Sequence, residues 1–417
     1  MPYRFVELLP KEFEKFEQQH ALGTYTQSIA QYHVLSARGR HPYLIGVKHD
    51  ERVVAAALVL TETTRFGSVF LFDRGPLIDF NDRALCHFFV TKSRQFAKQR
   101  GALYIEWTPN VTYLVTNNKG DMQQSVNDSF MTIMSGLGFQ HEPFTFGMST
   151  TGSPSWEYVK DISHLSDEKS ILKSYSKNVQ YYLKKNKQFG IQLRELSRTD
   201  LPSFKALTES TAERLHYHDK DLAFYESIYD IYGDDAIFVF AELNFETYIA
   251  SERDKVSALE QKLAKINEKI SKYPNQDKFK RQYHEFEDQK QHHSQRIQKA
   301  TKQFSDAGQA TVVVAGALFI KQPQEITYLY SGTYEAYKDY YGPYQIQDMM
   351  IRRAVALGIP RYNFYGISGR FDGSDGVLGF KTAFEGHARQ LVGRFILPVR
   401  PLKYKAYRAL KKITGRA

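Results

Sequence analysis

Residues 364–386, with the sequence FYGISGRFDGSDGVLGFKTAFEG, combine turn-forming glycines and aspartates with one lysine, Lys381. A phosphate-binding Walker A loop needs a glycine directly before Lys-Thr, whereas Phe380 precedes Lys381 here. An EF-hand loop needs alternating acidic ligands and a glutamate at the twelfth position, and that spacing is also missing. The segment therefore predicts a flexible loop leading to Lys381, which is either a solvated surface lysine or a lysine held in a partly apolar pocket.

Other catalytic patterns are missing from the sequence. No Gly-x-Gly-x-x-Gly follows a strand, and there is neither a Gly-x-Ser-x-Gly elbow nor a Cys-His pairing. His292 and His293 are adjacent, and neighbours on a helix face different directions, which argues against a shared metal ion. The single cysteine, Cys86, lies in the apolar run ALCHFFV and is expected to be buried in a reduced protein. We expect no metal and no cofactor.

A heptad pattern identifies a long helical hairpin in the middle of the chain. Val256, Leu259, Leu263, Ile266 and Ile270 recur at alternating steps of three and four residues. The pattern stops at Pro-Asn and then resumes with a second arm, which predicts two antiparallel helices. Lys290 and His293 fall on the seam of the second arm, where they suggest a looser tip or a device that fixes the register.

The two flanks of the hairpin share one order of predicted elements. The order is two strands, an amphipathic helix, a third strand and a segment that contains Gly-Phe. It occurs from VVAAALVL to IMSGLGF and again from VVVAGALFI to GVLGFKTAF. This order indicates an internal duplication of one α/β unit with the hairpin inserted in the second copy. We expect a first subdomain at 1–160, a second at 161–246 and 309–417, and the hairpin at 247–308.

The charge and the apolar content limit the function classes. The 417 residues carry a formal net charge of +10, which favours a polyanionic partner such as nucleic acid, a phosphorylated substrate or an acidic membrane surface. The N-terminus is charged, and no apolar run approaches the length of about 18 residues needed to span a membrane. We expect a cytoplasmic protein that is soluble or peripheral at the inner face of the membrane.

Several segments together resemble a known family. The segments that carry this resemblance are YNFYGISGRFDGSDGVLGFKTAFEG, LVGRFILPV, DRGPLIDF and YTQSIAQYHV. The chain resembles the FemABX family of peptidoglycan interpeptide-bridge aminoacyltransferases, which includes FemA and the related MurM and MurN. The resemblance covers nearly the whole chain. It implies an α/β fold of two tandem GNAT-like subdomains with an inserted antiparallel coiled-coil arm. It also implies transfer of Gly, Ala or Ser from aminoacyl-tRNA to the stem-peptide lysine or growing cross-bridge of a precursor.

The resemblance also implies roles for individual residues. Lys381 occupies the catalytic Phe-Lys position, where it would stabilise the tetrahedral oxyanion while Phe380 packs against it. Lys220 in HYHDKDLAFYE stands where the family usually has an arginine for the precursor diphosphate. Arg38 or Arg40 would replace the lysine that the family often has where this chain has Leu35.

The resemblance implies further contacts with the substrate. Arg74 in DRGPLIDF, Tyr225 and Tyr328 would line the substrate site, although buried tyrosines with ordinary packing roles are an alternative for the last two. The family's Asp-Pro after a strand is Thr108-Pro109 here, which removes a carboxylate that could serve as a base. Either the proton leaves through substrate groups or water, or the base lies elsewhere.

Two basic, tyrosine-rich stretches are candidates for binding polyanions. Lys177, Lys184 and Lys185 lie in KSYSKNVQYYLKKNKQFG, and RPLKYKAYRALKKITGR lies near the C-terminus. Either stretch would hold the tRNA acceptor arm, dock on anionic lipid, or form a solvated helix face.

Expected partners are aminoacyl-tRNA as co-substrate, a lipid-linked or UDP-linked muropeptide precursor, and another Fem-type protein or a second copy. Two alternative functions stay open. An acyl-coenzyme A-dependent GNAT-type transferase would need a pyrophosphate-binding turn that neither copy shows, and a non-catalytic tRNA-binding protein would form no product.

Overall fold

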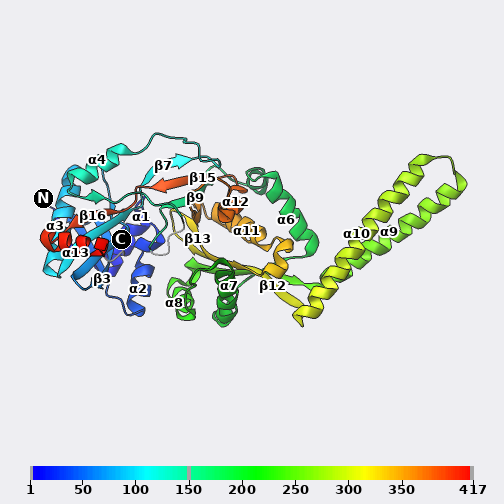
Figure 1. Cartoon of the computed structure of the whole chain (residues 1–417), viewed down its shortest axis with the longest axis horizontal. Coiled ribbons are helices and arrows are strands. Elements are labelled where there is room, and N and C mark those ends of the chain that lie inside the picture. The colour runs from blue at the N-terminus through cyan, green and yellow to red at the C-terminus, as the bar shows by residue number, and fades with distance from the viewer. Residues whose placement is uncertain (1–2, 148–151, 414–417) are drawn as a thin grey trace.

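A computed structural model describes residues 3–147 and 152–413. Two mixed β-sheets lie side by side with helices packed on them, and a long pair of helices projects from one end (Figure 1). The predicted α/β fold class, with two tandem units and an inserted antiparallel helical arm, is confirmed. No helix among the described residues has both the length and the apolar character needed to cross a membrane.

The first sheet contains eight strands, and its helices come from both ends of the chain. In spatial order the strands are β1 (Arg4–Glu7), β2 (Tyr43–His49), β3 (Arg52–Thr64), β4 (Gly67–Arg74), β6 (Ala102–Pro109), β16 (Phe395–Pro398) and β8 (Gln140–His141), with β5 (Leu77–Ile78) paired to β3. The helices of this half are α1 (Pro10–Gln19), α2 (Ile29–Ala37), α3 (Arg83–Gln99), α4 (Asp128–Gly136) and α13 (Pro401–Ile413).

The second sheet also contains eight strands. In spatial order they are β10 (Gln192–Glu195), β11 (Ala236–Asn244), β12 (Thr311–Lys321), β13 (Ile326–Thr333), β14 (Arg361–Gly366), β9 (Trp156–Asp161), β15 (His387–Leu391) and β7 (Thr112–Thr116). The helices of this half are α5 (Glu168–Lys173), α6 (Lys177–Phe189), α7 (Leu201–Leu215), α8 (Leu222–Tyr232), α11 (Gly342–Ala356) and α12 (Gly376–Thr382).

The two sheets repeat one pattern of strand directions. From β1 to β8 and from β10 to β15, three antiparallel pairings are followed by one parallel pairing and two antiparallel ones. The parallel pairs are β4 with β6 and β13 with β14. This shared order is what an internal duplication of one α/β unit would produce.

The repeated units exchange strands. β9 inserts between β14 and β15 of the second sheet, while β16, from the end of the chain, inserts between β6 and β8 of the first. β7 also joins the second sheet through β15. Sheet membership therefore does not follow one cut in the chain, and residues 112–116 and 156–161 pack with the half that was expected to begin at 161.

The central hairpin consists of α9 (Phe245–Lys272) and α10 (Asp277–Ala307), which point away from both sheets (Figure 1). The apolar seam residues Leu259, Leu263 and Ile266 are buried between the two helices. Near the base, His293 of α10 lies 2.7 Å from the buried carboxylate of Glu252 on α9. Because this pair joins the two arms at one position, it fits the predicted role of His293 in fixing the register.

Apolar side chains fill the space between each sheet and its helices. In α3 the buried residues Leu85, Cys86, Phe89 and Phe96 recur on one face, as the 3.6-residue period of a helix requires, and pack on the first sheet. Cys86 is free and buried, as the sequence predicts.

Candidate active site

Lys381 lies in the last turn of the short helix α12, directly after the glycine-rich loop. Its side chain is 4% exposed, and Nζ donates a hydrogen bond of 2.5 Å to the backbone carbonyl of Gly366 at the end of β14. Burial lowers the pKa of Lys381 to about 7, although Asp375 and Glu157 raise it. Of the two possibilities left open by the sequence, the structure therefore has the buried lysine, and both protonation states are populated near neutral pH.

Both ends of α12 are fixed by side chains. The carboxylate of Asp375 caps the N-terminus by accepting hydrogen bonds from the amides of Val377 and Leu378 at 2.9 and 3.0 Å. After the helix, Lys160 Nζ donates to the carbonyls of Phe384 and Glu385 at 2.8 and 2.9 Å. These contacts hold the helix in place and so fix the position from which Lys381 extends.

Phe380 also anchors this helix. Its ring lies 5.0 Å from Tyr344 of α11 and 5.7 Å from Phe384. Tyr344 in turn lies 4.6 Å from Tyr182 of α6, and Tyr182 stacks on Tyr341 at 4.3 Å. An aromatic row therefore connects the helix that carries Lys381 to the basic helix α6.

Three segments that are far apart in the sequence meet where the two sheets adjoin. Tyr25, in the short 3₁₀ turn η1 (Tyr25–Gln27), shares a hydrogen bond of 2.8 Å with Tyr365 of β14. Gln27 of the same turn donates to the backbone carbonyl of Asp73 at the end of β4. Residues of both sheets thus converge beside Gly366, the acceptor of the Lys381 hydrogen bond.

Buried ion pairs reinforce this junction. Arg74 donates to the Glu157 carboxylate at 2.7 Å and to the carbonyl of Pro154 at 2.5 Å. Arg389 contacts the other oxygen of Glu157 at 2.6 Å. Arg74 and Tyr365 also adopt left-handed φ angles of 58° and 65°, a conformation that is unfavourable for non-glycine residues and is concentrated at functional sites. The structure therefore gives Arg74, which the sequence predicts to bind substrate, an internal partner.

A second positively charged region lies at the Phe224 ring. Arg38, at the end of α2, lies 5.6 Å from this ring, and Lys220, before α8, lies 5.7 Å from it. Arg38 also forms two hydrogen bonds with Asp221, at 3.1 and 3.0 Å. The structure therefore brings the two predicted phosphate-binding cations together from opposite halves of the protein.

The alternative Arg40 is directed elsewhere, since it pairs with Glu62 at 3.4 Å.

The predicted tyrosines occupy different environments. Tyr225 is fully buried, and its hydroxyl donates to Asp219 at 2.7 Å, so any effect on a ligand would pass through Asp219. Tyr328 is half-buried in β13 and stacks on Phe319 at 5.3 Å. Burial raises the pKa of Tyr328 to about 12, so it is a neutral hydroxyl near physiological pH.

Helix α6 presents the predicted lysines Lys177, Lys184 and Lys185. Lys177 and Lys184 are exposed, while Lys185 is half-buried and lies 5.3 Å from the exposed ring of Tyr181. The helix starts beside α12, because the amide of Ser176 donates to the carbonyl of Ala383 at 3.1 Å. A row of cations therefore leads toward the helix that carries Lys381.

Comparisons with known proteins match nearly the whole chain. The model of the FemAB family matches residues 8–412. The chain belongs to the FemAB family. Aminoacyltransferase FemA of Staphylococcus aureus strain bovine RF122 / ET3-1 is 32% identical over 419 residues, which covers 99% of both chains, and FemA of strain MW2 gives the same values. Over 97% of this chain and 99% of the other, the structure resembles the crystal structure of FemX with a TM-score of 0.77 and 19% identity.

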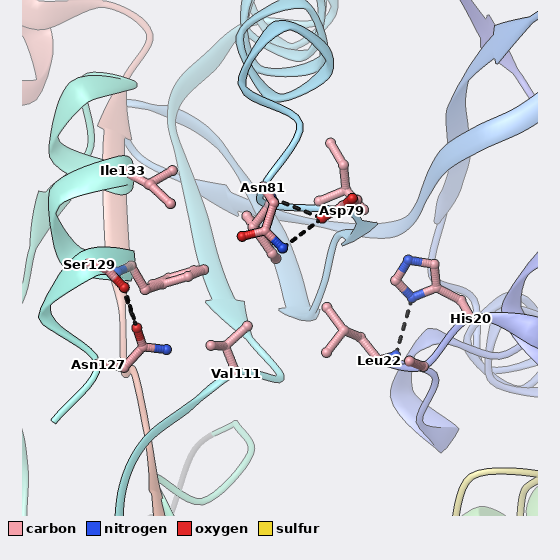
Figure 2. Close-up of a pocket in the computed structure, with 12 residues that line it drawn as sticks. His20, Leu22, Asp79, Asn81, Val111, Asn127, Ser129 and Ile133 are labelled. Atoms are coloured by element: carbon pink, nitrogen blue, oxygen red, sulfur yellow. Dashed lines mark hydrogen bonds between the residues drawn. The ribbon is translucent and has the colours of Figure 1, made fainter. Parts of the chain in front are cut away.

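A separate cavity of about 380 Å³ lies in the first half of this FemAB-family protein (Figure 2). Its lining includes Leu22, Val111, Phe130 and Ile133, with Asn81 among the polar groups around them. The cavity lining contains neither Lys381 nor any other residue that the sequence predicts for the site. Within the described ranges, no three His, Cys, Asp or Glu side chains are grouped so that they could hold a metal ion.

Sequence patterns alone did not identify Tyr25, Asp73, Glu157 or Tyr365 as part of the site. Three of them lie in the segments that carry the family resemblance, and Glu157 follows Trp156 at the start of β9. Their location in these segments was the only feature of the sequence that pointed to these three residues. Their contacts depend on strand exchange, because Glu157 reaches Arg74 only through the insertion of β9 into the second sheet.

Proposed function

We propose that this protein is an aminoacyltransferase that adds an amino acid, Gly, Ala or Ser, to an amine of a peptidoglycan precursor. The acceptor is the stem-peptide lysine or the growing cross-bridge, and the donor is aminoacyl-tRNA. The observation that carries the proposal is the buried Lys381 at the meeting point of three family segments, in a chain that is similar to FemA over its full length.

The chemistry needs few protein groups. An aminoacyl ester is already activated, so an amine can attack its carbonyl carbon without a protein nucleophile. The attack forms a tetrahedral oxyanion, and the C–O bond to the terminal ribose then breaks to release the tRNA hydroxyl. In its protonated form, Lys381 is suited to stabilise that oxyanion, and burial strengthens the interaction because little water screens it.

The acceptor site is proposed at the Phe224 region. Arg38 and Lys220 provide two cations on one aromatic ring, a suitable arrangement for the diphosphate that a UDP-linked and a lipid-linked precursor share. Arg38 offers two donors in a fixed fork, whereas Lys220 contributes a point charge. The salt bridge to Asp221 would orient Arg38 before the precursor binds.

The donor site is proposed along α6 and the aromatic row. Lys177, Lys184 and Lys185 would contact phosphates of the tRNA acceptor arm. The Tyr182 and Tyr341 rings provide faces on which terminal bases stack, and Phe380 lies between this row and Lys381. A tRNA held in this way would bring its esterified end toward Lys381.

The decisive experiment combines the purified protein, a mixture of charged tRNAs and a precursor with a free lysine amine. Mass spectrometry of the precursor should show added amino-acid masses, whose values identify the residue and the number transferred. Ribonuclease treatment of the tRNA should abolish the product. Product formed with acyl-coenzyme A instead, or tRNA binding without any product, would support one of the two alternative functions.

The donor surface is tested by charge reversal. Lys184→Glu with Lys185→Glu should weaken tRNA binding and reduce the dependence of its logarithm on salt concentration, since fewer phosphates are neutralised. The same reversal of Lys403 and Lys405 on α13, which packs on the first sheet away from α6 (Figure 1), tests the second basic stretch as the alternative. An unchanged salt slope in the α6 variant would remove this helix from the donor site.

The cellular setting follows from the substrates. We propose that the protein works in the cytoplasm, where aminoacyl-tRNA is available, and contacts the inner face of the membrane when the precursor is lipid-linked. Association with another Fem-type protein or with a second copy stays a prediction.

A further inference from the structure

Asp73, at the end of β4, is a partly buried residue whose carboxylate is held in place at the junction of the two sheets. It stands directly opposite Thr108 of β6 in the strand register. One carboxylate oxygen accepts a hydrogen bond from Thr108 Oγ1 at 3.2 Å, and the other accepts one from Ser153 Oγ at 2.8 Å. Gln27, which is fully buried, holds the backbone carbonyl of Asp73 at 2.8 Å. Both the backbone and the side chain of Asp73 are therefore held in place.

The neighbouring carboxylates are engaged differently. Glu157 is paired with both Arg74 and Arg389, and Asp375 caps α12. Within the described part of the chain, Asp73 bonds to hydroxyl groups and forms no ion pair within 4 Å. It can therefore take up a proton without breaking a salt bridge, unlike Glu157, and without weakening a helix cap, unlike Asp375.

The surroundings also favour proton uptake. Burial raises the pKa of Asp73, and Glu106 adds to this, while Arg74 and the two hydroxyl donors oppose it. The phenols of Tyr25 and Tyr365 also face this region, and burial raises the pKa of each. Near neutral pH these phenols are uncharged, so they are potential hydrogen-bond partners and do not compete for the proton.

Asp73 and Lys381 both lie near the end of β14. Tyr365, whose hydroxyl is bonded to that of Tyr25 near Asp73, is followed directly by Gly366, the acceptor of the Lys381 hydrogen bond. This arrangement places an anionic and a cationic group near one short stretch of backbone. Aminoacyl transfer needs such a combination, because an amine must lose a proton while an oxyanion forms.

Building on the aminoacyl transfer proposed above, we propose that Asp73 is the general base that binds the acceptor ammonium group and removes one proton from it. The freed lone pair attacks the ester carbonyl carbon, and a C–N bond forms. The ester C–O bond then breaks, one of the two protons still on the nitrogen is transferred to the departing ribose oxygen, and Asp73 releases its proton to water. Thr108 and Ser153 are positioning residues that orient the carboxylate.

The test compares Asp73→Asn with wild type in the transfer assay between pH 5.5 and 8.5. General-base loss typically costs about 10²- to 10⁴-fold, so kcat should fall by at least about 10²-fold at pH 7. The remaining rate should rise about tenfold per pH unit, because the free amine must then come from solution. Asp230→Asn, which alters a surface carboxylate paired with Arg198, should leave kcat unchanged. Circular dichroism and thermal unfolding verify folding.

Moving the carboxylate across the strand pair provides a rescue. Asp73→Asn combined with Thr108→Asp returns the charge to the registered neighbour and should recover at least tenfold of the lost rate. A loss in Asp73→Asn that is equal at every pH, or a kcat within threefold of wild type, would overturn the assignment while leaving aminoacyl transfer intact. If Asp73→Asn does not fold, the pH profile of wild-type kcat/KM provides the test. A kcat/KM that does not decrease at low pH would equally overturn the assignment of Asp73 as the base. A wild-type protein that transfers nothing would refute the proposed function itself.

Discussion

Replacing Lys381 with methionine should make the protein more stable and nearly inactive. The buried ammonium group has a pKa of about 7, whereas its ordinary value is 10.5. Each pKa unit corresponds to about 1.4 kcal/mol, so holding the charge in the folded state costs up to about 5 kcal/mol at pH 7 and below. Loss of the hydrogen bond to Gly366 returns about 1.5–3 kcal/mol of this. The net gain in the free energy of unfolding should be about 2–3.5 kcal/mol.

The pH dependence of this gain has a defined sign. Between pH 7 and pH 10.5 the unfolded chain binds more protons at Lys381 than the folded one, so the stability of wild type rises with pH in that range. The advantage of Lys381→Met should therefore be greatest at or below pH 7 and should shrink as the pH approaches 10.5.

Two measurements check this prediction. Urea unfolding at pH 6, 7, 8 and 9 gives the stability difference, and the transfer assay should show a rate loss of about 10²- to 10³-fold. A variant that is less stable than wild type at every pH would show that Lys381 serves the fold through Gly366. Activity within threefold of wild type would exclude Lys381 from oxyanion stabilisation.

The remaining predictions concern the precursor site and the hairpin. Arg38→Gln and Lys220→Gln should each raise KM for the precursor by at least about tenfold with little change in kcat, because each removes a charge-assisted contact worth about 1.5–3 kcal/mol. Arg40→Gln is the matched control. Equal effects of all three variants would argue against a specific diphosphate site. Burial raises the pKa of Glu252, but the hydrogen bond from His293 helps to hold this pKa below its ordinary value of 4.5. The pair should therefore stabilise the hairpin above pH 4.5, and this contribution should be lost as the pH falls through the lowered pKa. In limited proteolysis, the wild-type hairpin should therefore be cleaved faster in acid than at neutral pH. The hairpin of Glu252→Gln should be cleaved faster than that of wild type at neutral pH, and its cleavage rate should change little further in acid.

Sequence patterns predicted the elements of the fold well where the pattern is local. The heptad positions in α9 required an antiparallel partner, and the repeated order of strands and helices indicated a duplicated unit. Strand exchange was not predictable, because β9 and β16 are strands of only six and four residues, and so short a pattern does not specify which sheet a strand joins. Their placement depends on packing between the two halves.

The site divides in the same way. Lys381 was identified through its segment, and Arg38 and Lys220 were identified separately, but their meeting at Phe224 depends on how α2 approaches α8. Asp73 gave no signal of its own, because its role depends on the strand register that places it beside Thr108.

The sequence by itself determined the family, the duplicated α/β units, the helical hairpin and the residue types available for chemistry, since these follow from periodicity and from motifs read along the chain. Only the tertiary structure decided which of these residues face one another. It buried Lys381 and thereby lowered its pKa, paired Arg74 internally, and left Asp73 with neutral hydroxyl partners. The physical reason is that burial and proximity change the energy of a charge, and both are fixed by contacts between segments distant in the sequence.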